Sequence, residues 1–430
     1  LNVGCIPTKA LIASAHAYEK TNSYLNDGLF SCQKLSFSWD KIQARKDAIV
    51  AQHRRGLKFL MQKNKVAVQQ GLAALISPNT LLVSDIAEQP NATKKISFKH
   101  LLLATGSYIS PLPKSIEVKL ENPDLLHTSD TILAIKSVPK SIAIIGGGII
   151  GMEFACLFNT FGAQTSVYEV APTIIANEDE DSIAALSKSC EQRKINLHCA
   201  TAVKAITQSA SQKTVSVSSE HGSHKYEVVL LATGRSPATH RLQLDKIGVQ
   251  LAKTGHVPVD EQYNVVGHRH IYAIGDVIAT SALAHTASAE AMYVVEKIAG
   301  LKPSPIDYNT NPNAIYTMPE VASIGATEQE LRKQGVAYDK IKYPFLPSAK
   351  AKIEGCSEGH VKLLYGTKYR EILGAHIVNA KATELISELV LAKVLESTLD
   401  ELAHAIHPHP TLSETLMETA HAGIAGAIHL

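Results

Sequence analysis

The sequence has little net charge, no long apolar segment and no closely paired cysteines. Its 430 residues include 42 Lys and Arg against 40 Asp and Glu, a formal net charge of +2, and no long block of like charge is present. This balance argues against a nucleic-acid or membrane-surface binder, whose basic patch usually shifts the total. No apolar run reaches the roughly 18 residues that a membrane helix needs. The composition is typical of a globular protein, and its length suggests about three domains.

The cysteines lack the short paired spacings of a zinc site. In so large a chain this pattern favours a reducing compartment with most thiols buried. The six are Cys5, Cys32, Cys156, Cys190, Cys199 and Cys356.

The chain starts at Leu1, inside what reads as a functional motif, so we expect upstream residues to be missing. The absence of a signal or transit peptide then says little about location. We expect a bacterial cytoplasm, with the mitochondrial matrix as the alternative.

Hydrophobic periodicity and turn residues divide the chain into α/β segments followed by an α+β segment. A clear βαβ unit occupies strand 141–146, helix 149–161 and strand 164–169. From about residue 313, hairpin strands alternate with helices. The other predicted elements are helices 8–20, 38–64, 284–299 and 382–396, strand-turns 101–107, 230–235 and 271–276, and a hairpin at 360–378.

The strongest local motif is the glycine turn of the βαβ unit, Gly146-Gly147-Gly148-Ile149-Ile150-Gly151. Gly146 and Gly148 allow a tight turn and a close approach of backbone to a pyrophosphate, and Gly151 allows helix and strand to pack closely. The helix N-terminus adds amide donors. Glu169, at the end of the next strand, suits two ribose hydroxyls and repels a 2′-phosphate. With no Arg or Lys in 170–176, the motif predicts NAD rather than NADP; a glycine turn in an unrelated α/β protein is the alternative.

Cys5 lies in the segment LNVGCIPTK, directly before a predicted helix. A helix N-terminus favours the thiolate form of a nearby cysteine, and Lys9 adds a positive charge. By itself, this position leaves open whether Cys5 is reactive or an inert buried thiol.

The C-terminal segment HPHPTLSE, residues 407–414, allows three interpretations. Thr411 and Glu414 have the spacing of a capping box that starts the last helix. His409, held by prolines and followed five residues later by Glu414, is a plausible acid/base pair. A metal site formed by His404, His407 and His409 is a third possibility.

Seven segments taken together resemble the pyridine nucleotide–disulfide oxidoreductase family, most closely its dihydrolipoamide dehydrogenase branch. They occur in the family's order and cover essentially the whole chain, so the resemblance is highly specific. It implies two Rossmann-like domains and a C-terminal α+β dimerisation domain: an FAD-binding part (1–111), an NAD-binding part (112–238), a central part completing the FAD site (239–308) and a dimer-interface part (309–430). The segments are LNVGCIPTKAL (1–11), LLATGS (102–107), IIGGGIIGMEFA (144–155), LLATGRSP (230–237), YAIGDV (272–277), YTMPEVASIG (316–325) and HPTLSE (409–414).

The resemblance also implies roles for single residues. Cys5 matches the flavin-side cysteine of a redox disulfide, whose partner would directly precede Leu1, and the family's first βαβ unit, with its FAD pyrophosphate loop, would also lie upstream. Lys9 and Glu153 would form an ion pair beside flavin N5. His409 would be the base for the dithiol and Glu414 its orienting partner, both acting on the disulfide of the other subunit, with His407 one histidine too early for that role. The implied cofactor contacts are Thr105, Gly106, Gly234, Asp276 and Ala284; at Ala282 the family commonly has Met, which puts the flavin contact there in doubt.

The resemblance implies oxidation of dihydrolipoamide, carried on an acyltransferase of a 2-oxoacid dehydrogenase complex, by a homodimer that uses FAD and NAD⁺. A glutathione reductase would need basic residues after Glu169, and a mercuric reductase typically ends in a vicinal cysteine pair, whereas this chain ends in AIHL. A different class of alternative is a non-catalytic, NAD-binding fragment. We expect no nucleic-acid or membrane partner and no metal.

Overall fold

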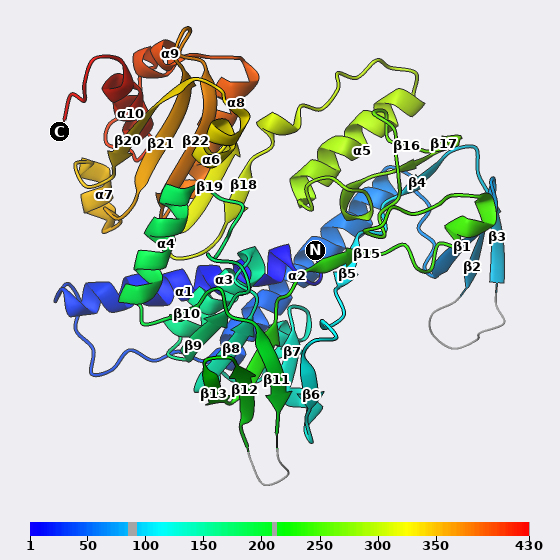
Figure 1. Ribbon diagram of the computed structural model, residues 1–430, viewed down its shortest axis with the longest axis horizontal. Coiled ribbons are helices and arrows are strands. Elements are labelled where there is room, and N and C mark those ends of the chain that lie inside the picture. The colour runs from blue at the N-terminus through cyan, green and yellow to red at the C-terminus, as the bar shows by residue number, and fades with distance from the viewer. Residues whose placement is uncertain (85–92, 209–212, 430) are drawn as a thin grey trace. The chain divides into compact units, whose positions relative to one another are not determined.

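The computed structural model describes residues 1–84, 93–208 and 213–429, and the chain divides into two compact units (Figure 1). The first unit contains residues 1–54, 112–233 and 309–430, and the second contains 55–111 and 234–308. Each unit therefore collects segments that are far apart in the sequence. Among the described residues, no helix is long and apolar enough to cross a membrane.

Two long helices open the chain: α1 (Cys5–Asn26) and α2 (Trp39–Lys63). The predicted helix at 8–20 is thus real but longer, beginning at Cys5 itself after Gly4, whose φ of 112° is favoured by glycine. Leu11, Ile12 and Ala15 are buried and belong to the largest apolar core of the first unit. This anchoring fixes the helix end that carries Cys5.

A five-stranded parallel sheet with the βαβ unit at its centre lies in the first unit. Its strand order is β10-β9-β8-β14-β7, and every pairing is parallel. The βαβ prediction is confirmed, because β8 is followed by α3 and then by β9. Buried strands of a parallel sheet are largely apolar, and β8 is apolar after its first residue, Ser141. The elements are β7 (Leu126–Thr128), β8 (Ser141–Ile145), α3 (Ile149–Thr160), β9 (Gln164–Tyr168), α4 (Glu180–Gln192), β10 (Asn196–His198) and β14 (Val228–Leu231).

A second, four-stranded sheet of this unit has the order β13-β12-β11-β6, in which β6 pairs parallel with β11 and the others are antiparallel. Its strands are β6 (Glu117–Lys119), β11 (Val203–Thr207), β12 (Val215–Ser219) and β13 (Gly222–Tyr226). Two 3-10 turns, η1 (Pro123–Leu125) and η2 (Thr131–Ala134), flank β7.

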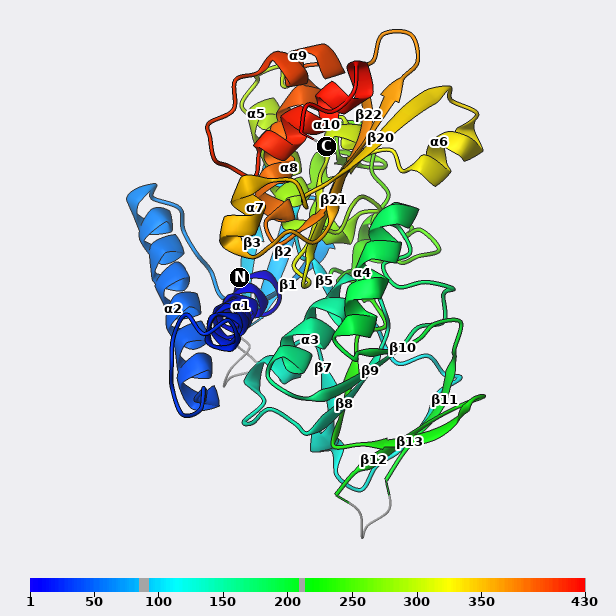
Figure 2. The same ribbon diagram turned by 90° about the vertical axis from the view of Figure 1, so that its left-hand side faces the viewer.

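The C-terminal part of the first unit is an antiparallel sheet with the order β18-β19-β22-β21-β20. The predicted hairpin is confirmed as β21 and β22, and helices α8 and α10 lie against the sheet (Figure 2). The elements are β18 (Asn313–Ile315), β19 (Glu320–Gly325), α6 (Glu328–Gln334), β20 (Tyr338–Pro344), α7 (Ala349–Glu354), β21 (His360–Gly366), β22 (Ile372–Asn379), α8 (Ala382–Val394), α9 (Leu399–His404) and α10 (Glu414–Ile424).

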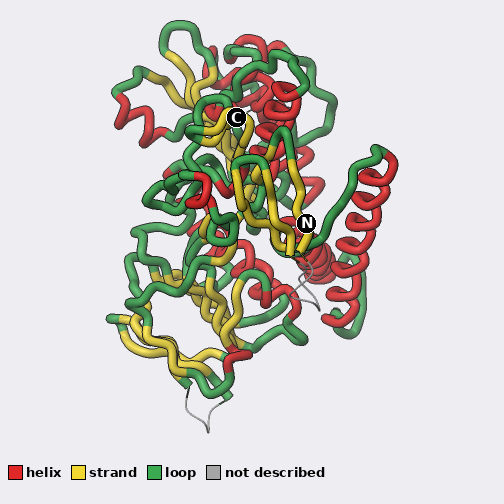
Figure 3. Tube along the Cα trace, turned by 90° about the vertical axis from the view of Figure 1, so that its right-hand side faces the viewer, coloured by secondary structure: helices red, strands yellow, loops and turns green. Residues whose placement is uncertain are grey.

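In the described part of the second unit the strands form three small sheets, and α5 is the α-helix that lies wholly within the unit. Strands β1, β2 and β3 form an antiparallel meander that faces the viewer in Figure 3. Strands β4 and β17 are parallel, β16 pairs with β17, and β5 pairs antiparallel with β15. The elements are β1 (Leu72–Ser77), β2 (Thr80–Ser84), β3 (Thr93–Ser97), β4 (Leu101–Leu103), β5 (Ser107–Ile109), β15 (Arg235–Pro237), η3 (Leu244–Ile247), β16 (Asn264–Val265), β17 (His268–Ala273), η4 (Gly275–Val277) and α5 (Ala284–Ile298), with η5 (Tyr308–Thr310) at its end.

Candidate active site

The glycine turn between β8 and α3 has the geometry that its sequence predicts. Gly146 has a φ of 113°, and a Cβ there would lie 2.3 Å from the carbonyl oxygen of Ala232. A Cβ on Gly151 would lie 1.9 Å from the carbonyl oxygen of Gly146, so helix and turn touch at this point. A Cβ on Gly148 would meet nothing within 4 Å. The turn is therefore closed on the side of the sheet and open at the N-terminus of α3.

The N-terminus of α3 is also not capped by a side chain of its own first turn. Its cap residue, Gly148, provides no side-chain hydrogen bond, and the first turn holds no acidic residue. Amides at such a terminus can receive a phosphate, and the helix dipole favours the negative charge. These observations fit the pyrophosphate of a dinucleotide.

The carboxylate of Glu169 lies at the end of β9, beside this turn. Oε2 accepts a hydrogen bond of 2.6 Å from the amide of Gly147, and Oε1 accepts one of 2.7 Å from the amide of Ala171. The sequence predicted that this residue would face ribose hydroxyls. Because each carboxylate oxygen has two lone pairs, each can accept one further bond beside its amide partner.

Cys5 and Lys9 lie one turn apart on α1, and the structure joins Lys9 to Glu153 of α3. Lys9 Nζ lies 2.7 Å from both carboxylate oxygens of Glu153. The Glu153 side chain is 3% exposed and that of Lys9 30%. Cys5 is exposed at the start of the helix. The ion pair thus connects the thiol-bearing helix to the helix of the nucleotide turn.

Tyr316 completes this ion pair, a role that motif reasoning missed. Its backbone amide donates to Glu153 Oε1 at 3.1 Å, and Lys9 Nζ lies 4.7 Å from the centre of its ring. A cation over an aromatic face gains a modest attraction. The segment YTMPEV contributed to the family resemblance, but it did not predict this contact. A hydrogen bond from a backbone amide does not depend on the identity of the side chain.

In the second unit, hydrogen bonds hold together the turns predicted to contact flavin. Asp276 Oδ2 accepts a 2.5 Å bond from the Ser107 hydroxyl, and that hydroxyl accepts a 2.8 Å bond from Arg235 Nε. Thr105 Oγ1 donates to Ala238 O at 3.0 Å, and Gly106 O accepts from the amide of Ala238 at 2.8 Å. The strand-turns at 101–107, 235–237 and 271–276 therefore form one connected framework.

Two other residues of this unit that were predicted to contact the cofactor are Gly234 and Ala284. Gly234 has a φ of 123°, and its carbonyl accepts from the amide of Ser110 at 3.1 Å. Ala284 is exposed as the first residue of α5.

Glu290 supports the turn that carries Asp276, and sequence reasoning missed it as well. Its fully buried carboxylate accepts a 2.6 Å bond from the amide of Gly275 and a 2.7 Å bond from the Tyr308 hydroxyl. Glu290 lies on the same buried stripe of α5 as Thr286 and Val294. A carboxylate on an otherwise buried helix face was the signal that could have identified it.

His409 and Glu414 form the predicted dyad. His409 Nδ1 donates to Glu414 Oε1 at 2.9 Å, and the His409 side chain is 73% exposed. Glu414 Oε2 accepts from the amide of Thr411 at 2.7 Å. Burial opposes ionisation of Glu414, but hydrogen bonds from the Thr411 amide and from His409 hold its pKa below the usual value. The carboxylate thus holds the exposed imidazole of His409 through Nδ1.

The other two interpretations of this segment fare differently. The capping box forms only in part: the Thr411 hydroxyl donates to Pro408 O instead of capping the helix, and α10 begins at Glu414 with Ser413 as its cap residue. His407 pairs with Glu388, and His404 Nδ1 bonds to Asp400 O. Among the described residues, no group of three His, Cys, Asp or Glu is placed to hold a metal ion.

Profiles of known families match nearly the whole chain. The pyridine nucleotide-disulphide oxidoreductase profile matches residues 1–291, and the profile of that family's dimerisation domain matches residues 311–420. The chain belongs to the pyridine nucleotide-disulphide oxidoreductase family. The predicted fold class is confirmed, and the chain is an oxidoreductase of a family that uses FAD and NAD(H).

Curated relatives and solved structures agree with this membership. Mitochondrial dihydrolipoyl dehydrogenase 1 of Arabidopsis thaliana is 36% identical, covering 100% of this chain and 84% of that protein. Dihydrolipoyl dehydrogenase of Bacillus subtilis is 34% identical, covering 100% and 91%. Leghemoglobin reductase of Glycine max is 36% identical, covering 98% and 80%. The crystal structure of LpdA from Mycobacterium tuberculosis shares the fold with a TM-score of 0.89 at 23% identity, covering 99% of this chain and 91% of that one.

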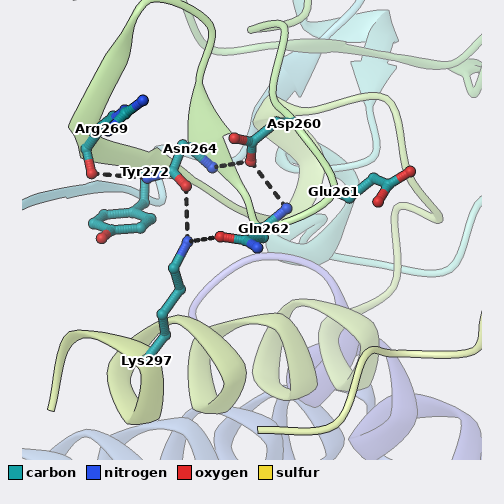
Figure 4. A pocket seen from close by; sticks show the side chains of 7 residues that line it. All are labelled: Asp260, Glu261, Gln262, Asn264, Arg269, Tyr272 and Lys297. Carbon is teal, nitrogen blue, oxygen red and sulfur yellow. Dashed lines mark hydrogen bonds between the residues drawn. The ribbon is translucent and has the colours of Figure 1, made fainter. Parts of the chain in front are cut away.

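Two pockets in the described parts of the chain are lined by none of the predicted site residues. In the second unit, a pocket of about 590 Å³ is lined by polar groups that bond to one another (Figure 4). Lys297 Nζ donates to Gln262 and Asn264 at 2.6 and 2.8 Å, and Asp260 accepts from the backbone amides of the same two residues. The pocket therefore lies at a turn whose polar groups already bond to one another. In the first unit, a cavity of about 830 Å³ lies between α1, α7 and residues 411–413.

Proposed function

We propose that this oxidoreductase is a dihydrolipoyl dehydrogenase: it oxidises protein-bound dihydrolipoamide to lipoamide and reduces NAD⁺ to NADH, releasing one proton. The observation that carries the proposal is the ion pair between Lys9 and Glu153, which joins the Cys5 helix to the nucleotide turn. A thiol site and a nucleotide site that share one ion pair suit electron transfer between a dithiol and a nicotinamide. The names of the Arabidopsis and Bacillus relatives support the same substrate.

The residues divide the work between the two ends of the reaction. His409, through its free Nε2, accepts a proton from the dithiol, and Glu414 stabilises the resulting imidazolium. The thiolate so formed exchanges with a disulfide that includes Cys5: one S–S bond forms as another breaks, and the Cys5 sulfur leaves as thiolate. Bound FAD would pass the electron pair from sulfur to the nicotinamide.

The nucleotide end is held by the chain's own backbone and carboxylates. The open amides of α3 would bind the NAD⁺ pyrophosphate, and Glu169 the adenosine ribose. Thr105, Gly106, Gly234, Asp276 and Ala284 would contact FAD. Glu153, buried beside Lys9, would lie next to the nicotinamide and keep the ammonium in place.

The wider assignments form part of this proposal. The chain acts as a homodimer, in which His409 serves the thiol site of the second subunit, and the matched dimerisation domain supports that arrangement. Its partner is the lipoyl-bearing acyltransferase of a 2-oxoacid dehydrogenase complex. The four-part division at residues 111, 238 and 308 is retained as proposed. The compartment is a bacterial cytoplasm, or a mitochondrial matrix. Among the described residues no two of the six cysteines pair with each other, which fits the reducing conditions of either.

The test is NADH formation from dihydrolipoamide by the complete gene product, supplied with FAD. We expect turnover with NAD⁺ well above that with NADP⁺, a loss of at least about 10³-fold in Cys5→Ser, and no loss in Cys32→Ser, an exposed thiol outside the site. A protein that binds FAD but ignores dihydrolipoamide would overturn the substrate assignment. Full activity in Cys5→Ser would overturn the mechanism.

A further inference from the structure

His407 has no role in the chemistry described above, although it lies two residues from the catalytic base. Its side chain is 6% exposed, whereas each of its neighbours from His404 to Pro410 is exposed. Ile406, directly before it, is 99% exposed. His407 is thus the point at which the segment between α9 and α10 is anchored before His409, and Leu412, 9% exposed, is the next anchor after it.

Both ring nitrogens of His407 face acceptors. Nε2 lies 2.7 Å from Oε1 of Glu388 on α8, and Nδ1 lies 2.8 Å from the carbonyl oxygen of Ala405. A carbonyl oxygen and an ionised carboxylate only accept hydrogen bonds. The ring is therefore held on one side by α8 and on the other by the backbone of its own loop.

His407 lies close enough to the dyad to act on it. The positive charge of His407 adds to the effects of the Thr411 amide and of His409, which hold the pKa of Glu414 below its usual value against the effect of burial. His409 and His407 are titratable groups that lower the pKa of Glu414, and Glu388 faces His407 from α8. The contact between His407 and Glu388 therefore holds the loop in place and keeps the His407 ring near Glu414.

We propose that Glu388 and His407 are a positioning pair for the catalytic base: the pair ties the loop to α8 and holds the His409–Glu414 dyad in its ionised, hydrogen-bonded arrangement. The catalytic part of this inference rests on the proposed function, but the structural part does not. Glu388→Gln removes the charge with little change in shape. Glu384→Gln, one turn earlier on α8 and exposed, is the matched control.

The first measurement needs neither substrate nor cofactor. Backbone hydrogen exchange across residues 405–411 of the complete gene product should be about tenfold faster in Glu388→Gln and unchanged in Glu384→Gln. Carbethoxylation of His409 should slow about threefold relative to the exposed His221 in the same sample, because the dyad no longer activates Nε2. Unchanged loop exchange would overturn the anchoring.

The second measurement separates positioning from mere support. With dihydrolipoamide, kcat of Glu388→Gln should fall about tenfold at unchanged KM, and the acid limb of its pH profile should move to higher pH, because the pKa of Glu414 rises. Faster loop exchange with unaltered His409 reactivity would overturn the positioning role and leave the pair purely structural. If the parent protein shows no turnover, the proposed function fails, and the exchange and carbethoxylation results still decide the inference.

Discussion

Lys9 and Glu153 are 144 positions apart in the sequence, yet they form a two-oxygen ion pair that is mostly withdrawn from water. A buried carboxylate is tolerated only when it is paired and hydrogen-bonded, and Glu153 has both the ammonium and the Tyr316 amide. The pair therefore matters to stability as well as to the proposed chemistry.

Replacing Lys9 with Met should lower the free energy of unfolding by about 3 kcal/mol, because Glu153 would remain buried without a counter-ion. Urea denaturation at neutral pH measures this. Lys20→Met is the matched control, since its partner Glu354 is 35% exposed, and its loss should stay below about 1 kcal/mol. Equal losses in both variants would contradict the argument from burial.

Glu169 should determine the choice between the two nicotinamide nucleotides. Replacing it with Ala removes the charge that repels a 2′-phosphate, so NADH should bind about tenfold more weakly and NADPH should lose its disadvantage. Fluorescence titration with each nucleotide checks this against Glu191→Ala, an exposed change on α4. An unchanged preference for NADH would show that another group selects the nucleotide.

Motifs in the sequence predict residues that we propose to act through their side chains, such as Cys5, Glu169 and His409. They do not identify Tyr316 or His407. Tyr316 contributes a backbone amide and an aromatic face, and His407 is defined by a partner on a different helix. Contacts of these kinds depend on the tertiary arrangement, which single-sequence patterns do not contain.

Among the elements, the β8–α3 turn was predicted most completely, because strand period, glycine spacing and helix start all agree. The start of α10 was not. A capping-box pattern placed the cap at Thr411, but the hydroxyl bonds to Pro408 and the helix begins later. Here the hydrogen bonds of the loop before α10 determine where the helix begins, and the local sequence pattern does not.

Two glycines of the nucleotide turn should behave oppositely. Gly151→Ala places a methyl group against a carbonyl oxygen, so the free energy of unfolding should fall by about 1–3 kcal/mol. Gly148→Ala meets no atom within 4 Å and should keep the melting temperature while weakening NADH binding, because its methyl group enters the space proposed for the pyrophosphate. Undiminished NADH binding in Gly148→Ala would place the nucleotide elsewhere.

Lys362 connects α4, α6 and β21 through a buried network. It is 1% exposed and lies 2.8, 2.6 and 2.6 Å from Asp179, Asp181 and Glu328. Burial opposes ionisation of Glu328, but hydrogen bonds from Lys340 and Lys362 hold its pKa at about 2, below the ordinary 4.5. Its stabilising effect is complete above pH 4.5 and is lost as the pH falls towards 2.

Lys362→Met should therefore lower the free energy of unfolding at pH 7 by about 3–5 kcal/mol, because three carboxylates lose their shared cation. Without Lys362 the buried carboxylates favour protonation, so the difference from the parent should narrow between about pH 7 and about pH 4. Urea denaturation at both pH values tests this. Lys340→Met, whose parent side chain is 54% exposed, should show a smaller loss. A stability deficit of Lys362→Met that grows on acidification would contradict the network.

At the scale of the whole molecule, the order of segments along the chain conveys the family, but the compact units cut across that order. Residues 1–54 belong with 112–233 and 309–430, whereas 55–111 belong with 234–308. Such grouping follows from strand pairing between distant segments, for example β4 with β17. Changes of composition along the sequence do not predict which distant strands pair.

The most direct test of the account uses two subunits with complementary defects. Cys5→Ser removes the thiol and His409→Gln removes the base, and each homodimer alone should lose at least about 10²-fold in dihydrolipoamide-dependent NADH formation. After the two are unfolded together and reassembled in equal amounts, about a quarter of the parent activity should return, because half of the dimers then hold one intact site of two. A mixture as inactive as its parents, despite demonstrated heterodimers, would contradict the shared site. So would substantial activity in either variant alone.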